Sequence, residues 1–323
     1  MSAVHVATAG EHVLVRSELA WASAIVEEAS VPDLADAAPS LEVRIERGTR
    51  AFDLAGATPI ARGVVAAEGR VIVADVATSG FDLLADATGD HPVFSFRWRP
   101  SARTRALRVA FRSRQHLLTR AALLQFPALW RAALRGRAPL HVAACTVGED
   151  VPLLAGPGGV GKTTLVAKEV ASGGRASGDN LAVSDGRSVW GLVEPLRVEG
   201  GRGRKMPHGR TEAALDARAE VLVPDRVLVL QRGRAEEPDV CACSQEQAAR
   251  ALVAGTYAAK ELHRFWSFAA VLAIGTGLGP AHPPVAEVAG ELAGRLPALI
   301  VTLPRRPGPE LGRLLAMGVE TCA

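Results

Sequence analysis

Lysine is scarce in this chain of 323 residues. It occurs only at Lys162, Lys168, Lys205 and Lys260, so arginine carries nearly all of the positive charge. Arginine favours planar, bidentate contacts with phosphate or carboxylate groups, but a GC-rich genome enriches it equally well. Because the formal net charge is a mild +3, the charge gives no ground for a nucleic-acid partner, and we expect none.

Long apolar runs and a cysteine framework are missing as well. The longest apolar stretch, residues 265–278, is interrupted by a serine and two glycines and is too short to span a bilayer. The first residues carry none of the basic, apolar and small-residue parts of a signal peptide. Four cysteines in a chain this long do not form a disulfide framework. We therefore expect a cytoplasmic protein with no membrane contact.

The rest of the composition is that of a folded, globular protein, with 48% hydrophobic and 22% charged residues. The length suggests two domains. Residues 1–100 contain short β-like segments separated by turns, which predict a smaller, β-rich N-terminal domain. Residues 101–137 predict a helical linker, and residues 138–323 a second domain in which strands and helices follow one another. The expected fold class is α/β.

Apolar residues of the linker recur at roughly helical spacing, with arginines between them. Pro127 is expected to kink or divide this helix. A basic amphipathic helix can bind a membrane or a partner protein. We prefer the interpretation of a helix that bridges two domains with its arginines in water.

The most specific feature is a glycine-rich segment of the second domain. A short apolar run ends at Gly156, the pattern G-x-x-x-x-G-K-[ST] follows, and a helical pattern begins after it. Backbone N–H groups of such a loop form an anion nest at the positive end of a helix. Lys162 supplies charge for the β- and γ-phosphates, and the Thr163 hydroxyl is placed to bind Mg²⁺. We predict a nucleoside triphosphate site at Gly156, Pro157, Gly158, Gly159, Val160, Gly161, Lys162, Thr163 and Thr164.

A second basic element follows this segment in the sequence. Residues 200–210 form a glycine-rich loop that carries Arg204 and Lys205. Such a loop either closes on the triphosphate as a charge-stabilising lid or stays a solvated loop without a role. We include both side chains among the expected nucleotide contacts.

Two groups of residues have side chains of the type that binds metals, namely Asp75, Asp82, Asp86 and His91 in the first domain, and Cys241 and Cys243 in the second. Turns and solvated strand ends explain the first group better than a metal cluster does. The two cysteines share one face of a strand, but no second Cys/His pair follows at the spacing of a zinc site. We expect no metal at either group.

Two further elements lie beside the glycine loop. His141 stands in the strand before the loop, and Gly178-Asp179-Asn180-Leu181 follows the first helix after it. The segment 257–266, with Glu261, precedes an apolar helix. On these residues the second domain resembles the HPr kinase/phosphorylase family and its relatives, which include kinases that act on lasso-peptide precursors. The resemblance implies an HPr kinase/PEP carboxykinase-like P-loop domain behind a smaller β-rich domain.

The resemblance also implies roles for particular residues. The first acidic residue of the family's pair, here Asp179, acts as the base while the γ-phosphate of ATP or GTP moves to a hydroxyl group. Chemistry agrees, because the attacking hydroxyl must lose its proton. His141 orients the acceptor or contacts phosphate, although a histidine packed at a strand start explains it equally well. Asn180 departs from the family, which has a second aspartate there, but its amide oxygen can still bind Mg²⁺. Glu194 is a candidate for the missing carboxylate, with a strand-end glutamate as the equal alternative, so both join Thr163 as expected Mg²⁺ ligands.

We therefore expect a kinase whose acceptor is a hydroxyl group of a peptide, a protein or a small molecule, with natural-product tailoring as one setting. Two alternatives stay open: a regulatory NTPase without an acceptor, and a nucleotide-binding module of a modification complex. The family's second signature is absent beyond Glu194 and Arg197, which argues against phosphorylase activity and against HPr as the substrate. ATP and GTP remain equal choices, because no base-reading N-K-x-D motif occurs. Relatives often form oligomers, so a homo-oligomer is left open.

Overall fold

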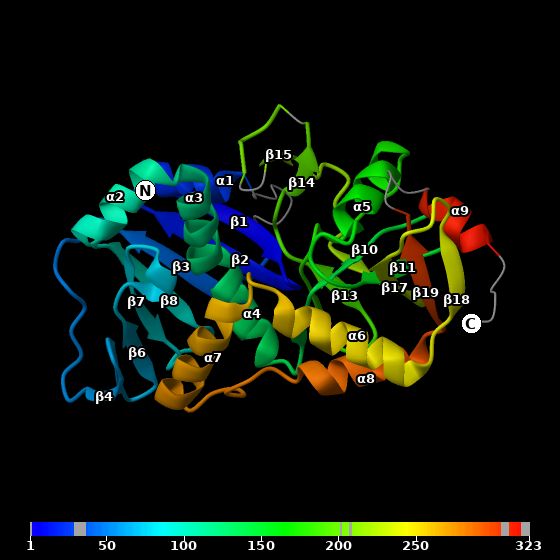
Figure 1. Ribbon diagram of the computed structural model, residues 1–323. Helices are drawn as coiled ribbons and strands as arrows, with labels where there is room; N and C mark the ends of the chain where they lie inside the picture. Colours follow the sequence, from blue (N-terminus) through cyan, green and yellow to red (C-terminus); the bar gives the residue numbers. More distant parts are fainter. Residues whose placement is uncertain (1, 29–36, 201, 207–208, 305–309, 318–323) are drawn as a thin grey trace. The chain divides into compact units, whose positions relative to one another are not determined.

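The computed structural model describes residues 2–28, 37–200, 202–206, 209–304 and 310–317 (Figure 1). The chain divides into two compact units. Unit 1 comprises residues 1–136 together with 263–283, and unit 2 comprises residues 137–262 together with 284–323. Strands and helices of both units give a mixed α/β protein. In the described part of the chain, no helix has the length and apolar character needed to cross a membrane.

In the described part of unit 1, eight strands form a single sheet in the order β1-β2-β3-β8-β7-β6-β5-β4. The pairs β2–β3 and β3–β8 are parallel, and the other pairs are antiparallel. The strands are β1 (Ser2–Thr8), β2 (Glu11–Ser17), β3 (Leu41–Glu46), β4 (Thr58–Ala61), β5 (Val64–Ala67), β6 (Arg70–Val73), β7 (Phe81–Asp86) and β8 (Val93–Trp98).

The helices of unit 1 come from both of its chain segments. They are α1 (Ala20–Glu27), a 3₁₀ turn (Val76–Thr78), α2 (Ala102–Ala110), α3 (Arg112–Arg120), a π-helical turn (Ala121–Gln125), α4 (Phe126–Ala133) and α7 (His263–Thr276). The helical segment breaks at Phe111, which has φ −128° and ψ 56°. Pro127 lies within the helical run from Arg112 to Ala133, and the π-helical turn Ala121–Gln125 divides this run just before the proline, as expected of a residue that lacks the N–H.

Aromatic packing explains why these helices belong to unit 1. The Trp130 ring of α4 meets Phe94 of β8 with centroids 5.7 Å apart, and Phe126 meets Phe268 of α7 at 5.6 Å. Phe265 and Phe268 of α7 are buried as well. Segment 101–137 is therefore part of a folded unit, whereas we expected a linker. Residues 263–283 also join unit 1, whereas we expected one continuous domain over 138–323.

Unit 2 is built around a five-stranded sheet in the order β10-β11-β17-β19-β18, in which β11, β17 and β19 are parallel. A four-stranded sheet, β16-β13-β12-β9, and a hairpin, β14-β15, accompany it. The strands are β9 (Ala138–Leu140), β10 (Val142–Ala144), β11 (Pro152–Ala155), β12 (Ala182–Ser184), β13 (Val189–Gly191), β14 (Leu196–Glu199), β15 (Arg210–Ala213), β16 (Val221–Leu222), β17 (Arg226–Arg232), β18 (Asp239–Ala242) and β19 (Ala298–Leu303).

Helices cover both faces of this five-stranded sheet (Figure 1). They are α5 (Lys162–Ala171), α6 (Gln245–Ala258), α8 (Val285–Arg295) and α9 (Leu311–Ala316). Helices α5 and α9 bury leucines against strands β11, β17 and β19 on one face, while α6 and α8 lie on the other. A capping box starts α6: Ser244 Oγ accepts from the Gln247 N–H, and Gln247 Oε1 accepts from the Ser244 N–H.

Candidate functional site

A glycine loop joins β11 to α5 and occupies residues 156–161. Gly156, Gly159 and Gly161 have φ of 143°, 80° and 125°, a region that side-chain-bearing residues rarely adopt. A Cβ on Gly156 would lie 2.6 Å from the Leu230 carbonyl oxygen of β17. Glycine is thus required both for the backbone conformation and for the close approach of two parallel strands.

The loop ends where α5 begins, at Lys162. The Lys162 ammonium bends back over the loop and donates to the Gly156 oxygen at 2.8 Å and to the Pro157 oxygen at 3.3 Å. Burial lowers the pKa of Lys162 to about 8, and the carboxylates of Asp179 and Glu261 oppose this change. A buried ammonium at a helix N-terminus makes this end of α5 electropositive. Such a place stabilises an anion.

Asp179 lies in the segment between α5 and β12. Ser177 fixes this segment to β10, because its N–H donates to the Ala144 oxygen and its Oγ accepts from the Ala144 N–H. The Asp179 side chain is fully buried, and its Oδ2 accepts from Asn180 Nδ2 at 2.9 Å. Its Oδ1 has no hydrogen-bond partner among the described residues.

Burial and, to a lesser extent, the neighbouring Glu194 carboxylate raise the pKa of Asp179 to about 7. The Thr163 hydroxyl and the Arg197 guanidinium act in the opposite direction. The structure therefore brings Lys162, Thr163 and Asp179 together, although 15 intervening residues separate the last two in the sequence. A buried carboxyl group with this pKa can accept a proton near neutral pH.

Arg197 connects the carboxylates around this centre. Its guanidinium contacts Glu261 Oε1 at 2.7 Å, Glu194 Oε2 at 3.2 Å and Asp179 Oδ2 at 3.9 Å. These contacts raise the pKa of Arg197 although burial acts against them, so the guanidinium stays charged. Arg197 thus offsets part of the negative charge that three nearby carboxylates would otherwise leave unpaired.

Glu194 differs from the metal ligand that we expected. Its Oε1 accepts from the N–H groups of Asn180 and Leu181 at 3.0 and 3.1 Å, and its Oε2 faces Arg197. Both oxygens are therefore engaged with the protein, and the side chain is 4% exposed. Glu194 positions the Asp179-Asn180 segment in this structure.

His141 precedes the loop at the junction of β9 and β10. Its N–H donates to Thr256 Oγ1 of α6 at 3.0 Å, which fixes the residue beside the loop. Burial and the nearby Lys162 charge lower the pKa of His141 to about 4, so the imidazole is neutral at physiological pH. Its Nδ1 is buried and has no hydrogen-bond partner among the described residues.

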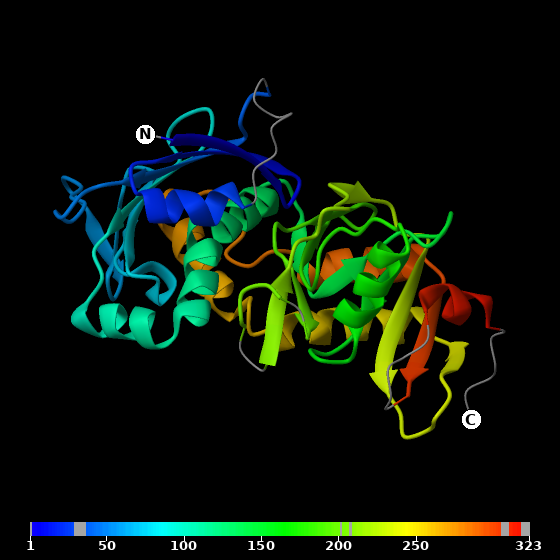
Figure 2. The ribbon, with the colours of Figure 1, turned by 90° about the horizontal axis from the view of Figure 1, so that it is seen from above.

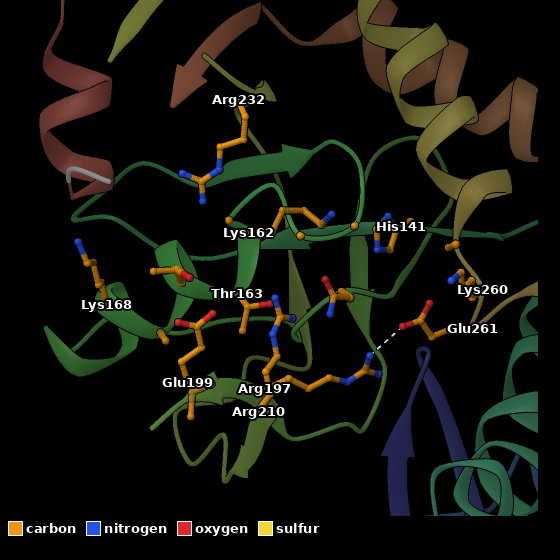
Figure 3. A pocket seen from close by; sticks show the side chains of 18 of the residues that line it. His141, Lys162, Thr163, Lys168, Arg197, Glu199, Arg210, Arg232, Lys260 and Glu261 are labelled. Carbon is orange, nitrogen blue, oxygen red and sulfur yellow. Dashed lines mark hydrogen bonds and ion pairs between the residues drawn. The ribbon is translucent and has the colours of Figure 1, made fainter. Parts of the chain in front are cut away.

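His141, Lys162, Thr163 and Arg197 line a cavity of about 870 Å³ within unit 2 (Figure 3), whereas Asp179 and Glu194 do not line it. The glycine loop, the start of α5, the β14–β15 hairpin and the end of α6 form its walls. Figure 3 shows Arg232 on one side of Lys162 and Thr163, and Arg197 and Arg210 on the other. The titratable side chains of the walls are His141, Lys162, Lys168, Arg197, Glu199, Arg210, Arg232, Lys260 and Glu261. Cations outnumber carboxylates there, which suits an anionic ligand.

Two expected nucleotide contacts lie elsewhere. The Arg204 guanidinium forms an ion pair with Glu212 at 3.2 Å, and the backbone of Lys205 forms an isolated β-bridge with Thr211 of β15. Neither side chain lines the cavity, whereas Arg210 from the same basic loop does. The cause is that the loop ends in a β-hairpin, in which Arg210 pairs with Glu199 at the cavity wall.

Two residues of the cavity wall were not predicted from the sequence: Arg232 was not named there, and Glu261 was given no role. Arg232 ends β17, and a Cβ on Gly161 would lie 3.2 Å from its Nη2. Its Nη1 donates to the Pro304 oxygen after β19 at 2.6 Å. Because β11, β17 and β19 are parallel, their carboxyl ends meet at one edge of the sheet. A charged residue at the end of a buried strand was the signal that could have identified Arg232.

A magnesium ion would find oxygen donors at one place in this cavity. The Thr163 hydroxyl and the Asn180 amide both line the wall, and Asp179 stands directly behind them. Hydroxyl, amide and phosphate oxygens are ligands that Mg²⁺ accepts. Among the described residues, no group of three or more His, Cys, Asp or Glu side chains is arranged to hold a metal.

The other two metal candidates have structural contacts instead. Asp75 Oδ1 accepts from the Gly80 N–H at 2.7 Å, and Asp82 Oδ1 accepts from the Asp75 N–H at 3.0 Å. These bonds fix the turn before β7. In the second pair, Cys241 is buried in β18, while Cys243 is a free, partly exposed thiol outside the strand.

No protein-family model matches this chain, and no curated protein is similar to it in sequence. The residues of the site therefore carry the functional assignment.

Proposed function

We propose that this protein is a P-loop kinase of the HPr-kinase-like type, which transfers the γ-phosphate of ATP or GTP to a hydroxyl group. One observation carries the proposal: the buried Asp179 carboxyl group, with one unpartnered oxygen, adjoins Thr163 and Lys162 at the start of α5. A phosphate nest and a carboxyl group with a pKa near neutrality are the two parts that hydroxyl phosphorylation needs.

In this proposal, each residue has a defined role. The glycine loop and the N-terminus of α5 hold the β- and γ-phosphates, and Lys162 exchanges its bonds with the loop carbonyls for bonds with phosphate oxygens. Mg²⁺, held by Thr163 and Asn180, neutralises charge on the β- and γ-phosphates when it is bound. Arg232 and Arg210 supply further cations from the opposite walls.

The transfer step balances as follows. The acceptor oxygen forms a bond to the γ-phosphorus while the bond between that phosphorus and the bridging oxygen of the β-phosphate breaks, and the diphosphate leaves. The hydroxyl proton passes to Asp179 Oδ1, the oxygen without a partner among the described residues. The phosphorylated acceptor is a peptide, a protein or a small molecule with a free hydroxyl group.

A second candidate function rests on the complete burial of Asp179. In this second function, the Asp179 carboxyl group has no access to the cavity. It orders Thr163 and its metal but receives no proton from an acceptor hydroxyl. The protein would then be a regulatory NTPase or a nucleotide-binding module of a modification complex.

One substitution distinguishes these functions. Full-length protein with γ-labelled ATP is screened against hydroxyl-bearing peptides and small alcohols, and Asp179→Asn is compared with the unaltered chain. The proposal predicts label transfer to an acceptor, a loss of at least about 10²-fold in Asp179→Asn, and nucleotide affinity within about threefold of the unaltered value. Transfer at an unchanged rate in Asp179→Asn would remove the residue from its role. Nucleotide binding without transfer to any acceptor would favour the second function.

A further inference from the structure

Helix α2 and the start of α3 form a basic surface on unit 1. Between Asp90 and Glu149 the chain carries no acidic residue but eleven arginines. We define the α2 surface by its exposed side chains, Arg103, Arg105, Leu107, Phe111, Arg112 and Arg114. In both views α2 lies at the margin of unit 1 (Figures 1 and 2).

Helix α2 contacts the rest of its unit through Thr104 and through Arg108, whose guanidinium lies 3.7 Å from the Trp21 ring centroid and 5.0 Å from that of Trp98. Thr104 is its only buried residue. Leu107, Val109 and Phe111 are 39%, 72% and 57% exposed. A helix of nine residues is marginal on its own, because most helical stability comes from packing of an apolar face. Leu107 and Phe111 therefore offer an apolar face that unit 1 leaves uncovered.

The arginines of the α2 surface differ in their ion pairing from other arginines between Asp90 and Glu149. Arg97, Arg99 and Arg120 pair with Glu46, Asp82 and Glu28. By contrast, the side chains of Arg103, Arg105, Arg112 and Arg114 show no ion pair or hydrogen bond with any described residue. Each of these exposed guanidinium groups can bind a carboxylate in a bidentate manner. Arg103 projects from the same side of α2 as Leu107, whereas Arg105 projects from another side.

We propose that the α2 surface binds an acidic segment of a protein or peptide that carries apolar side chains between its carboxylates. The spacing supports this partner. Arg103 and Leu107 are four residues apart, so a cation and an apolar side chain share one side of α2, and Phe111 follows directly after the helix ends. A segment with alternating acidic and apolar side chains complements this arrangement.

Two other anionic partners fit less well. A membrane-surface helix keeps its cations on the face opposite its apolar residues, whereas here Arg103 and Leu107 share one side of α2. A nucleic acid would leave Leu107 and Phe111 against its phosphates, and single strands favour several aromatic residues for stacking, whereas Phe111 is the one aromatic side chain of this surface.

The test uses the full-length protein and fluorescence anisotropy. The probe is a labelled twelve-residue peptide in which Glu alternates with Leu and Phe, and its partner has Ser in place of Leu and Phe. Arg103→Glu/Arg112→Glu is compared with Arg62→Glu/Arg187→Glu, which changes the net charge equally at exposed arginines elsewhere. Circular dichroism confirms that each variant is folded.

We expect the dissociation constant of the Leu/Phe peptide to rise at least tenfold in Arg103→Glu/Arg112→Glu and less than twofold in the control. Leu107→Ser/Phe111→Ser should raise it at least threefold with no change in charge. Equal weakening in both charge variants, or equal affinity for the Ser peptide, would overturn the proposal. So would tighter binding of phosphatidylserine vesicles or of a twenty-residue oligothymidylate that the same variants abolish.

Discussion

Asp179 is a carboxyl group that water does not reach, and its environment keeps a proton on it to an unusually high pH. Burial is the main cause, and Glu194 adds to it, while Thr163 and Arg197 limit the change. The same burial that suits a base destabilises the fold whenever the group is charged. A rise in pH should therefore increase the proposed activity, which needs the charged carboxylate, and lower the stability of the fold.

The rate of γ-phosphate loss from ATP should rise with pH between about 6 and 8 and then level off, because the base acts in its deprotonated form. The apparent pKa should lie near 7, as expected for Asp179. The measurement is a pH profile of kcat/KM at constant ionic strength. A flat profile from about pH 5.5 to 8.5 would exclude a base of this kind.

Asp179→Asn should stabilise the protein above pH 7. The folded-state pKa of Asp179 lies above the ordinary aspartate value of 3.8. Between about pH 4 and 7 the folded state therefore holds a proton that the unfolded state releases, and stability falls as the pH rises through this window. The variant lacks this penalty, so its free energy of unfolding at pH 8 should be higher by about 1–3 kcal/mol.

Urea unfolding at pH 8 and pH 4 measures this difference. Near pH 4 the two proteins should be alike, since Asp179 is then neutral in the folded state. Asp216→Asn, at an exposed position, serves as the control and should change stability by less than about 0.5 kcal/mol at both pH values. A variant that is less stable than the parent at pH 8 would contradict the assignment of a raised pKa.

The glycine loop shows how one element serves both packing and binding. Gly156 has no space for a side chain, because its Cβ would meet the Leu230 oxygen. Gly158 has ordinary backbone angles, and a Cβ added to it would have no atom within 4 Å. The first glycine is explained by strand packing, whereas the second has no structural reason within the protein and faces the cavity.

Substitution of these two glycines by alanine should therefore separate stability from binding. Gly156→Ala should lower the free energy of unfolding by about 2–4 kcal/mol through strain and steric overlap. Gly158→Ala should leave it within about 0.5 kcal/mol, yet weaken MgATP binding at least tenfold because the methyl group occupies phosphate space. Urea unfolding and calorimetry test both variants. Unchanged MgATP affinity in Gly158→Ala would place the phosphates elsewhere.

At the scale of the whole molecule, local sequence patterns predicted part of this architecture. The α/β class and the strand–loop–helix of the glycine loop follow from short-range signals. The assignment of α7 to unit 1 does not follow from short-range signals, because Phe265 and Phe268 would suit any aromatic core. Which core they join depends on Phe94 and Phe126, which are distant in the sequence.

Some residues of the candidate site were likewise predictable from local sequence, and others were not. Lys162, Thr163, His141 and Asp179 stand out by their local sequence, and the structure brings them together. Arg204 and Lys205 were expected because they lie in a basic loop, but a hairpin sends Arg210 to the wall instead. Arg232 and Glu261 reach the cavity through sheet order and helix packing, which no local pattern encodes.

Calorimetric titration of the full-length protein with MgATP tests the central claim most directly. The proposal predicts saturable binding to unit 2 that Lys162→Ala weakens by at least about 10²-fold, since the buried ammonium lies against the loop carbonyls. Lys168→Ala, one to two turns along α5, should weaken it by less than about tenfold. Failure of the unaltered protein to bind MgATP, or equal affinity in Lys162→Ala, would contradict the account.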